Sequence, residues 1–240
     1  MTGSDRANSA GDDLRAALLR AMGESGGGLA AVTRLARLAL ESLPIDGASV
    51  SLMADTGNRE TLYTSDDVIA EIENRQFGLG EGPCFEAFET RRPVLIADLD
   101  SPDGARWPIF AAERGERIAA VYAFPLVTGA TCLGVVALYR ARPGWLSTAD
   151  LAVTLRIIDA VTVALLEMGA EHRTAPWTDL PANHPHIHQA TGMLIAAFQM
   201  PAQHALARLR GYAFSTGRPL AEVADDLVTR RLDPHDLDQC

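Results

Sequence analysis

The chain has 240 residues, of which 48% are hydrophobic and 22% charged, and its formal net charge is −10 at pH 7. This length suits one larger domain and one small one, since single domains usually contain roughly 100 to 200 residues. An acidic chain is a poor general nucleic-acid surface, because phosphate contacts favour basic side chains, so any nucleic-acid site must be local.

Missing residue types exclude several chemistries. No lysine occurs in the chain, and histidine occurs only from His172 onward. A P-loop lysine and a Schiff-base lysine are therefore excluded, and the larger domain has no imidazole for a triad, a haem or a metal. Three widely spaced cysteines without a CxxC pair argue against disulfides and structural zinc. We expect no metal and no cofactor.

Apolar stretches in this sequence are short and interrupted by charged residues. None is the uninterrupted run of about 20 apolar residues that a membrane helix needs. Residues 1–13 lack the basic start, apolar stretch and cleavage site of a signal peptide. These features predict a cytoplasmic protein without membrane contact.

Hydrophobic periodicity predicts the elements of the larger domain. Residues 1–28 contain a short amphipathic piece and a Gly-rich run, and are interpreted as a flexible leader. The elements expected after it are helix 29–43, strands 48–53 and 60–64, helices 66–76 and 85–90, strand 94–97, helix 107–114, strands 119–126 and 132–139, and helix 147–167. Ser147 and Asp150 form a capping-box-like start for the last helix. This order predicts an α+β domain, residues 29–168, with an antiparallel sheet flanked by helices.

Prolines between residues 174 and 185 mark a change in composition. Residues 169–184 are therefore expected to be a linker. Three short helical patterns follow, at 185–199, 201–217 and 219–232, and predict a small all-α module over residues 185–232 with a tail at 233–240. His184, His186 and His188 cluster at its start, but no nearby Cys or carboxylate completes a zinc set, which favours a solvated helix start.

A glycine in the middle of the first C-terminal helix is the most informative feature of this module. Gln189, Gly192 and Ala196 lie on the face opposite the apolar stripe. A mid-helix glycine costs about 1 kcal/mol relative to Ala, so something must compensate. Close approach of RNA and a packing contact with the long helix or a second subunit are both consistent with it.

The second C-terminal helix carries Arg208 and Arg210 beside its apolar stripe, and Phe214 pointing away from it. Loop RNA is recognised through phosphate contacts to Arg and base stacking on aromatic rings. The alternatives are that the arginines are simply solvated and that Phe214 closes a dimer contact.

The C-terminal segment resembles the ANTAR family of RNA-binding antiterminators, through the run 188–194 (His-Gln-Ala-Thr-Gly-Met-Leu) and matching positions in the next two helices. The resemblance implies a three-helix module, usually dimeric, that binds paired stem-loops in nascent leader RNA and prevents a terminator hairpin from forming. It implies RNA contact at Gln189, Gly192 and Arg210. Thr191 stands where the family commonly has lysine.

Residues 29–168 resemble GAF domains of the kind that accompany ANTAR modules. The matching motifs are Gly80-Glu81-Gly82-Pro83-Cys84, Arg92-Pro93-Val94, Arg106-Trp107-Pro108 and Phe124-Pro125-Leu126. The resemblance implies a sensor that binds a small molecule or dimerises. A ligand pocket over the sheet is suggested, with the aromatic residues Phe85, Trp107, Phe110, Tyr122 and Phe124, all of which could also be core.

Three classes of function follow. The first is a non-enzymatic, dimeric RNA-binding antiterminator gated by the sensor, with the long helix 147–167 as dimer interface. The second is a signalling protein whose helical module docks a DNA or protein partner. The third is a thiol enzyme of the GAF fold using Cys84 and Cys132, which the absence of a neighbouring histidine disfavours.

Overall fold

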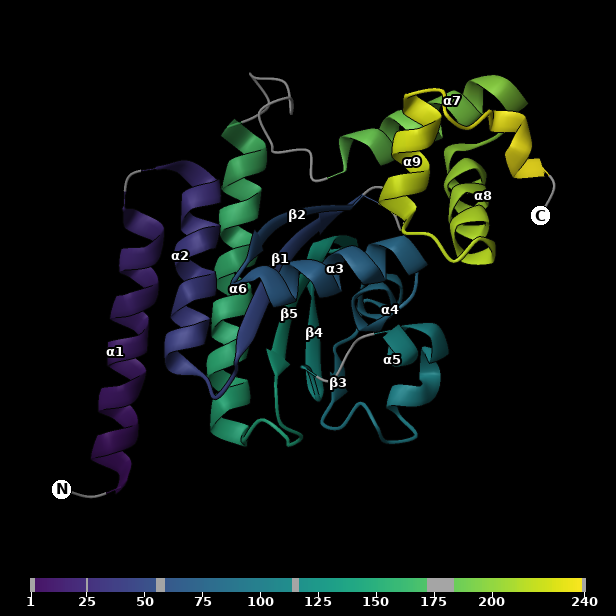
Figure 1. The fold of residues 1–240 in the computed structure, drawn as a ribbon. Coiled ribbons are helices and arrows are strands. Elements are labelled where there is room, and N and C mark those ends of the chain that lie inside the picture. The colour runs from purple at the N-terminus through teal and green to yellow at the C-terminus, as the bar shows by residue number, and fades with distance from the viewer. Residues whose placement is uncertain (1–2, 25, 55–58, 114–116, 172–183, 239–240) are drawn as a thin grey trace.

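The structure is a computed structural model that describes residues 3–24, 26–54, 59–113, 117–171 and 184–238 (Figure 1). Five strands of the described chain form one sheet in the order β2-β1-β5-β4-β3, and each neighbouring pair is antiparallel. The strands are β1 (Gly47–Met53), β2 (Arg59–Thr64), β3 (Val94–Ile96), β4 (Ala120–Thr128) and β5 (Thr131–Arg140). This is the antiparallel, helix-flanked sheet that the sequence predicts.

Two long helices, α2 (Gly27–Ser42) and α6 (Thr148–Glu171), cover one face of the sheet, and α1 (Gly3–Gly23) lies outside them (Figure 1). Strand alternation sends Tyr122, Phe124 and Leu126 to this face, where they are buried with the apolar stripes of both helices. Ser147 caps α6 as predicted: its Oγ accepts a hydrogen bond from Asp150 N, and its own N–H donates to the Asp150 carboxylate.

Shorter helices cover the other face: α3 (Asp67–Leu79), α4 (Pro83–Thr90), η1 (Gly104–Arg106) and α5 (Pro108–Glu113). The Asp66 carboxylate caps α3 by accepting a hydrogen bond from Ile69 N at 3.0 Å. Gly80 ends the helix in the left-handed conformation, at φ 70°. Glu81 then accepts hydrogen bonds from the main-chain nitrogens of Ile109 and Phe110 at the start of α5, so the Gly-rich loop joins two helices.

The C-terminal module contains α7 (Pro185–Phe198), α8 (Ala202–Ser215), α9 (Leu220–Val228) and η3 (Pro234–Asp238). Its apolar stripes meet in a core that is continuous with the core under α3 and α4. The module lies beside the C-terminal end of α3 (Figure 1). Sensor and module are therefore in contact.

Two regions differ from the sequence-based expectations. Helix α1 occupies most of the segment interpreted as a flexible leader, and its Ala21 is buried against the α2–α6 face. The short helix η3 occupies the segment interpreted as a tail. Most of the expected linker, residues 172–183, lies outside the described residues. Among the described helices, none has the length and apolar character needed to cross a membrane.

Candidate functional site

The outer face of α7 is open. Gln189, Gly192 and Ala196 are exposed, as the helical pattern predicts. A Cβ built at Gly192 would meet no atom of the described chain within 4 Å. The long helix α6 therefore does not approach this glycine, and the described chain offers no packing contact at this position.

Phe214 near the end of α8 is 63% exposed, which is unusual for a phenylalanine. Arg208 is half-buried on the other side of α8, with its guanidinium 4.6 Å from the centre of the Phe198 ring. A guanidinium over an aromatic face is a cation–π contact that orients the arginine. These two candidate residues thus present an exposed ring and an oriented guanidinium.

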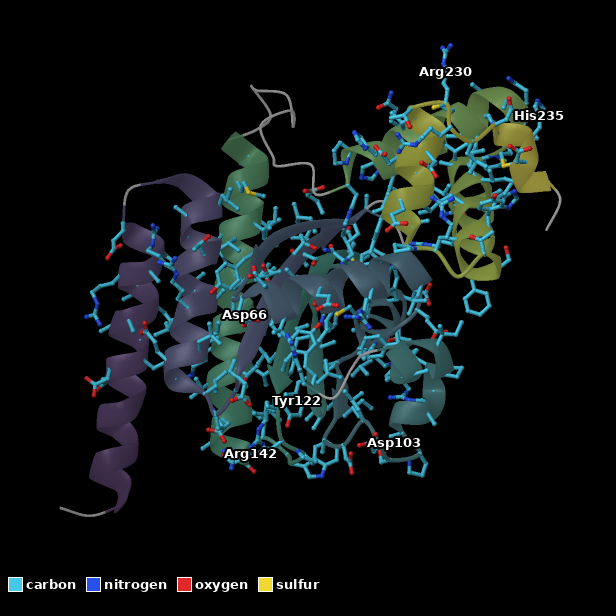
Figure 2. The ribbon with its side chains drawn as sticks, viewed as in Figure 1. Asp66, Asp103, Tyr122, Arg142, Arg230 and His235 are labelled. Carbon is cyan, nitrogen blue, oxygen red and sulfur yellow. The ribbon has the colours of Figure 1, made fainter. Side chains whose placement is uncertain are left out.

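Other arginines of the module are engaged with carboxylates or directed outward. Arg218 and Arg231 both form ion pairs with Asp226. Arg230 is exposed, and Figure 2 shows it projecting outward from the C-terminal helices. Two arginines of the module are thus neutralised by Asp226, whereas Arg230 faces solvent.

Arg210, by contrast, faces the sensor domain. Its Nε and Nη2 both donate hydrogen bonds to the main-chain oxygen of Phe77, at 3.1 and 2.8 Å. Its guanidinium carbon lies 5.4 Å from the Phe77 ring centre and 5.9 Å from that of Phe85. Burial, together with the nearby Arg59 charge, lowers the pKa of Arg210 to about 10, so the side chain stays charged at neutral pH.

His184, just before α7, completes this contact between the domains. Its ring stacks on the Phe77 ring, with centres 4.6 Å apart and planes within 2°. Burial is the main cause that lowers the pKa of His184 to about 4, and the nearby His188 and Arg59 contribute to the same shift. His184 is therefore neutral at pH 7 and suited to stacking on an apolar ring.

A buried polar cluster lies inside the sensor domain, and of its members only Cys84 was singled out from the sequence. It consists of Arg59, Glu73, Gln76, Cys84 and Tyr139, all buried between β5, α3 and α4. Arg59 forms an ion pair with Glu73, and the Tyr139 hydroxyl donates a hydrogen bond to the same carboxylate. Gln76 Oε1 accepts a hydrogen bond from Cys84 N at 3.1 Å, and its Nε2 donates to the Tyr139 oxygen at 3.2 Å.

This cluster places charged and polar groups in the interior of the domain, where they are removed from water. Among the residues that the structure describes, Arg59 Nε and Nη1 have no hydrogen-bond partner, although both are buried. Burial raises the pKa of Tyr139 well above its usual value, so the phenol stays protonated. A buried guanidinium with two unsatisfied donors is an uncommon feature that suits a negatively polarised group of a ligand.

The structure does not bring the five aromatic candidates into one pocket. Phe85, Trp107 and Phe110 are buried on the α3–α5 face of the sheet, whereas Tyr122 and Phe124 are buried on the α2–α6 face. The sheet separates the two groups, so the pocket suggested from the sequence is corrected to two halves of the hydrophobic core.

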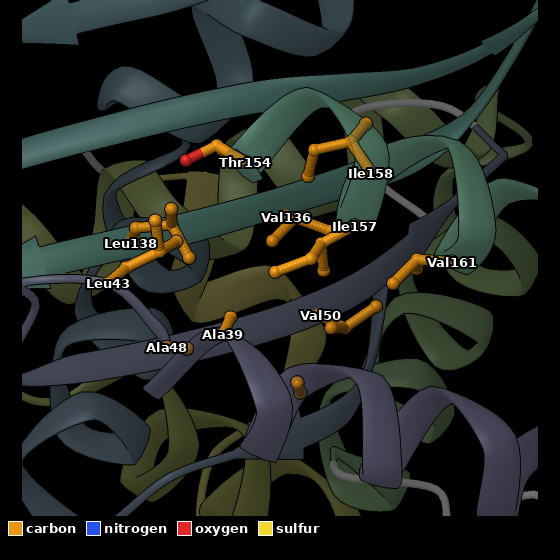
Figure 3. A pocket seen from close by; sticks show the side chains of 11 residues that line it. Ala39, Leu43, Ala48, Val50, Val136, Leu138, Thr154, Ile157, Ile158 and Val161 are labelled. Carbon is orange, nitrogen blue, oxygen red and sulfur yellow. The ribbon is translucent and has the colours of Figure 1, made fainter. Parts of the chain in front are cut away.

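A small cavity lies on the α2–α6 face, lined by apolar residues of both helices and the sheet, with Thr154 as its polar contributor (Figure 3). Its volume is about 10 Å³. A dry apolar cavity of this size is too small for any ligand larger than a water molecule. It is a packing defect rather than a binding site.

Cys84 and Cys132, the cysteines within the described residues, are not joined in a disulfide. Cys84 is fully buried in the polar cluster, whereas Cys132 is half-buried near the start of β5. Burial raises the pKa of Cys132, so its thiol stays protonated and weakly nucleophilic near neutral pH. In the described part of the chain, no group of three or more His, Cys, Asp or Glu side chains could hold a metal ion.

The sheet and its two helical layers form one larger α+β domain, and the appended helical trio forms a second, smaller one. Family models agree: a GAF domain matches residues 29–166 and an ANTAR domain matches residues 181–228. Because the first match spans more than half of the chain, the protein belongs to the GAF family and carries a C-terminal ANTAR domain.

Solved structures resemble the sensor in fold. The GAF domain of a phosphoenolpyruvate-protein phosphotransferase from Acinetobacter superposes with a TM-score of 0.53 at 13% identity, covering 75% of this chain and 100% of that one. The corresponding domain from Coxiella burnetii gives 0.52 at 16% identity, covering 67% and 94%. No curated protein matches the sequence. The chain is thus a signalling regulator built from a GAF domain and a C-terminal ANTAR domain.

Proposed function

We propose that this protein is a non-enzymatic, cytoplasmic antiterminator that binds paired stem-loops in nascent leader RNA, and that its GAF domain gates this binding in response to a signal. The ANTAR match supports the RNA-binding role, and the GAF match supports the sensory role.

The open face of α7 carries the proposal. A glycine that no atom of the described chain approaches, flanked on one face by Gln189 and Ala196, allows an RNA backbone or base to reach the helix main chain. Gln189 supplies an amide that can donate to and accept from a base edge. Phe214 supplies a face on which an unpaired base can stack, which is how proteins commonly read loops.

Net charge shapes the mode of binding. The chain carries a charge of −10, and two arginines of the module are engaged with Asp226. Few phosphates can then be neutralised, so the affinity should depend only weakly on salt. Shape and stacking, rather than counterion release, therefore supply most of the binding free energy.

The signal that the GAF domain senses is a small molecule with a polar or anionic group. The polar cluster around Arg59 favours this chemistry, since two buried donors of that guanidinium lack partners in the described chain. The α2–α6 face is apolar and closely packed, and supports no such ligand.

A homodimer places two modules against a paired stem-loop target. Three large apolar residues on the outer side of α6 favour this helix as the interface: Leu155, Val163 and Leu166 are 47%, 43% and 44% exposed. Exposed apolar residues gathered on one helix are typical of an interaction surface.

Titration of the full-length protein into a labelled paired stem-loop RNA tests the proposal, with a duplex DNA of the same length and a single-stranded RNA as competitors. Preferential binding of the stem-loop RNA, with a shallow salt dependence, supports it. Equal affinity for the three nucleic acids, or no affinity for any, removes the RNA role and leaves docking of a protein partner.

A further inference from the structure

The contact between the two domains uses one of the residues matched to RNA binding. Arg210 donates two hydrogen bonds to the Phe77 carbonyl of α3. The last four carbonyls of a helix have no intrahelical partner, and a cation near this end is stabilised by the helix dipole. Arg210 therefore caps α3 from the neighbouring domain.

The end of α3 is shaped to receive this guanidinium. A Cβ added at Gly80 would lie 2.7 Å from Arg210 Nη1, so the glycine leaves the space that the arginine fills. The ring of Phe77 makes a cation–π contact with the Arg210 guanidinium and also stacks on the ring of His184. The first residue of α9, Leu220, also lies next to Gly78. Three separate parts of the module thus meet the same helix end.

The same helix end is tied to the sensor interior. Gln76, the residue before Phe77, accepts the Gly80 N–H with its main-chain oxygen and holds Cys84 and Tyr139 with its side chain. Glu73, one turn earlier, holds Ser49 and Arg59. A change in the polar cluster that shifts Gln76 must also shift the Phe77 carbonyl, because both belong to the same last turn of α3.

We propose that the Arg210 cap on α3 is an autoinhibitory contact: in the docked arrangement Arg210 is withheld from RNA, and a signal that displaces the end of α3 releases it. This inference rests on the proposed RNA-binding function. Docking and RNA compete for one guanidinium, whereas Gln189, Gly192 and Phe214 stay exposed in the docked form.

A test must undo the contact without altering Arg210. Gly80→Asn does this, since Asn tolerates the left-handed conformation at φ 70° but places its side chain where the guanidinium lies. Gly129→Asn is the matched control: it has φ 56°, and no atom of the described chain lies within 4 Å of its Cβ position. His184→Ala is an independent second variant that removes the stack on Phe77, with His204→Ala, at an exposed position of α8, as its control.

Two readouts on the full-length variants separate the outcomes. Stem-loop RNA affinity should rise about tenfold for Gly80→Asn and for His184→Ala over their controls, and amide hydrogen exchange in the last turn of α3 should rise with it. Raised amide exchange in α3 with unchanged RNA affinity would show that docking and RNA do not compete for Arg210. Unchanged exchange in both variants overturns the contact itself.

Failure of the RNA role has a different signature. If exchange rises in both variants while no variant binds any stem-loop RNA, the proposed function is wrong, and the withholding of Arg210 from RNA falls with it. Arg210→Ala completes the set, because it should raise exchange yet bind RNA more weakly than Gly80→Asn. Equal RNA affinity of these two variants would contradict a role for Arg210 in both states.

Discussion

Arg59 of β2 and Glu73 of α3 form an ion pair inside the sensor domain, with side chains only 2% and 1% exposed. Desolvating two charges is expensive, and the carboxylate is also held by Ser49 and Tyr139. Removing one partner leaves the other charge buried and uncompensated. The stability of the sensor should therefore depend strongly on this pair.

Glu73→Gln should lower the free energy of unfolding by about 3 to 5 kcal/mol, because the Arg59 charge then lacks its carboxylate. The matched control is Glu71→Gln on the same helix, whose ion pair with Arg75 is exposed and worth about 0.5 kcal/mol at most. Urea unfolding of both variants measures the difference. Similar losses for the two would show that the interior pair is no more important than the surface one.

Gly192→Ala should separate stability from function. With no described atom near this position, Ala should raise the unfolding free energy by about 0.5 to 1 kcal/mol through helix propensity. The new methyl group should weaken stem-loop RNA binding about tenfold if RNA reaches the helix main chain. Gly169→Ala on α6, also with open space in the described chain, should leave RNA binding unchanged. A Gly192→Ala protein with full RNA affinity would exclude close approach at this face.

Acidification should weaken the contact of His184 with Phe77. The pKa of His184 is about 4 in the folded protein and near 6.5 when unfolded, so between these values the unfolded chain binds more protons. Stability contributed by neutral His184 is thus complete above pH 6.5 and is lost as the pH falls toward 4. Thermal unfolding of the wild type and of His184→Gln at several pH values measures this, since carboxylates common to both cancel. The difference in unfolding temperature between the wild type and His184→Gln should become smaller as the pH falls. A difference that does not change with pH would refute the lowered pKa of His184.

Leu155→Glu on the outer face of α6 should convert the proposed dimer to a monomer, because a charge would be buried at an apolar interface. Light scattering after size exclusion measures the mass. Val127→Glu, at an exposed apolar position of β4, is the control and should not change it. A wild-type protein that is already monomeric would dismiss α6 as the interface.

Local patterns predicted most of the fold. Strand alternation and helical periodicity identified the sheet and its helices, and the capping-box pattern of Ser147 and Asp150 marked the start of the long helix. Such features depend on residues within one or two turns of each other, so the sequence displays them directly.

Contacts between distant segments were harder to predict. The polar cluster did leave a signal, because Glu73 and Gln76 occupy the same helical stripe as Ile69, Ile72 and Phe77, where apolar residues are expected. The two-sided placement of the aromatics follows from β4 alternation together with the helices, but only once the sheet order is known. The contact of Arg210 with Phe77 joins two domains, and a helical wheel shows only that the side chain flanks its own stripe.

The central claim is that RNA meets the exposed face of α7 and the end of α8. Ultraviolet crosslinking of a paired stem-loop RNA to the full-length protein, followed by mass spectrometry of the crosslinked peptides, tests it most directly. The account predicts crosslinks at Phe214 and in the α7 peptide that contains Gln189 and Gly192, and a gain at Arg210 in Gly80→Asn. Crosslinks confined to the GAF domain, or none above the level seen with duplex DNA, would contradict it.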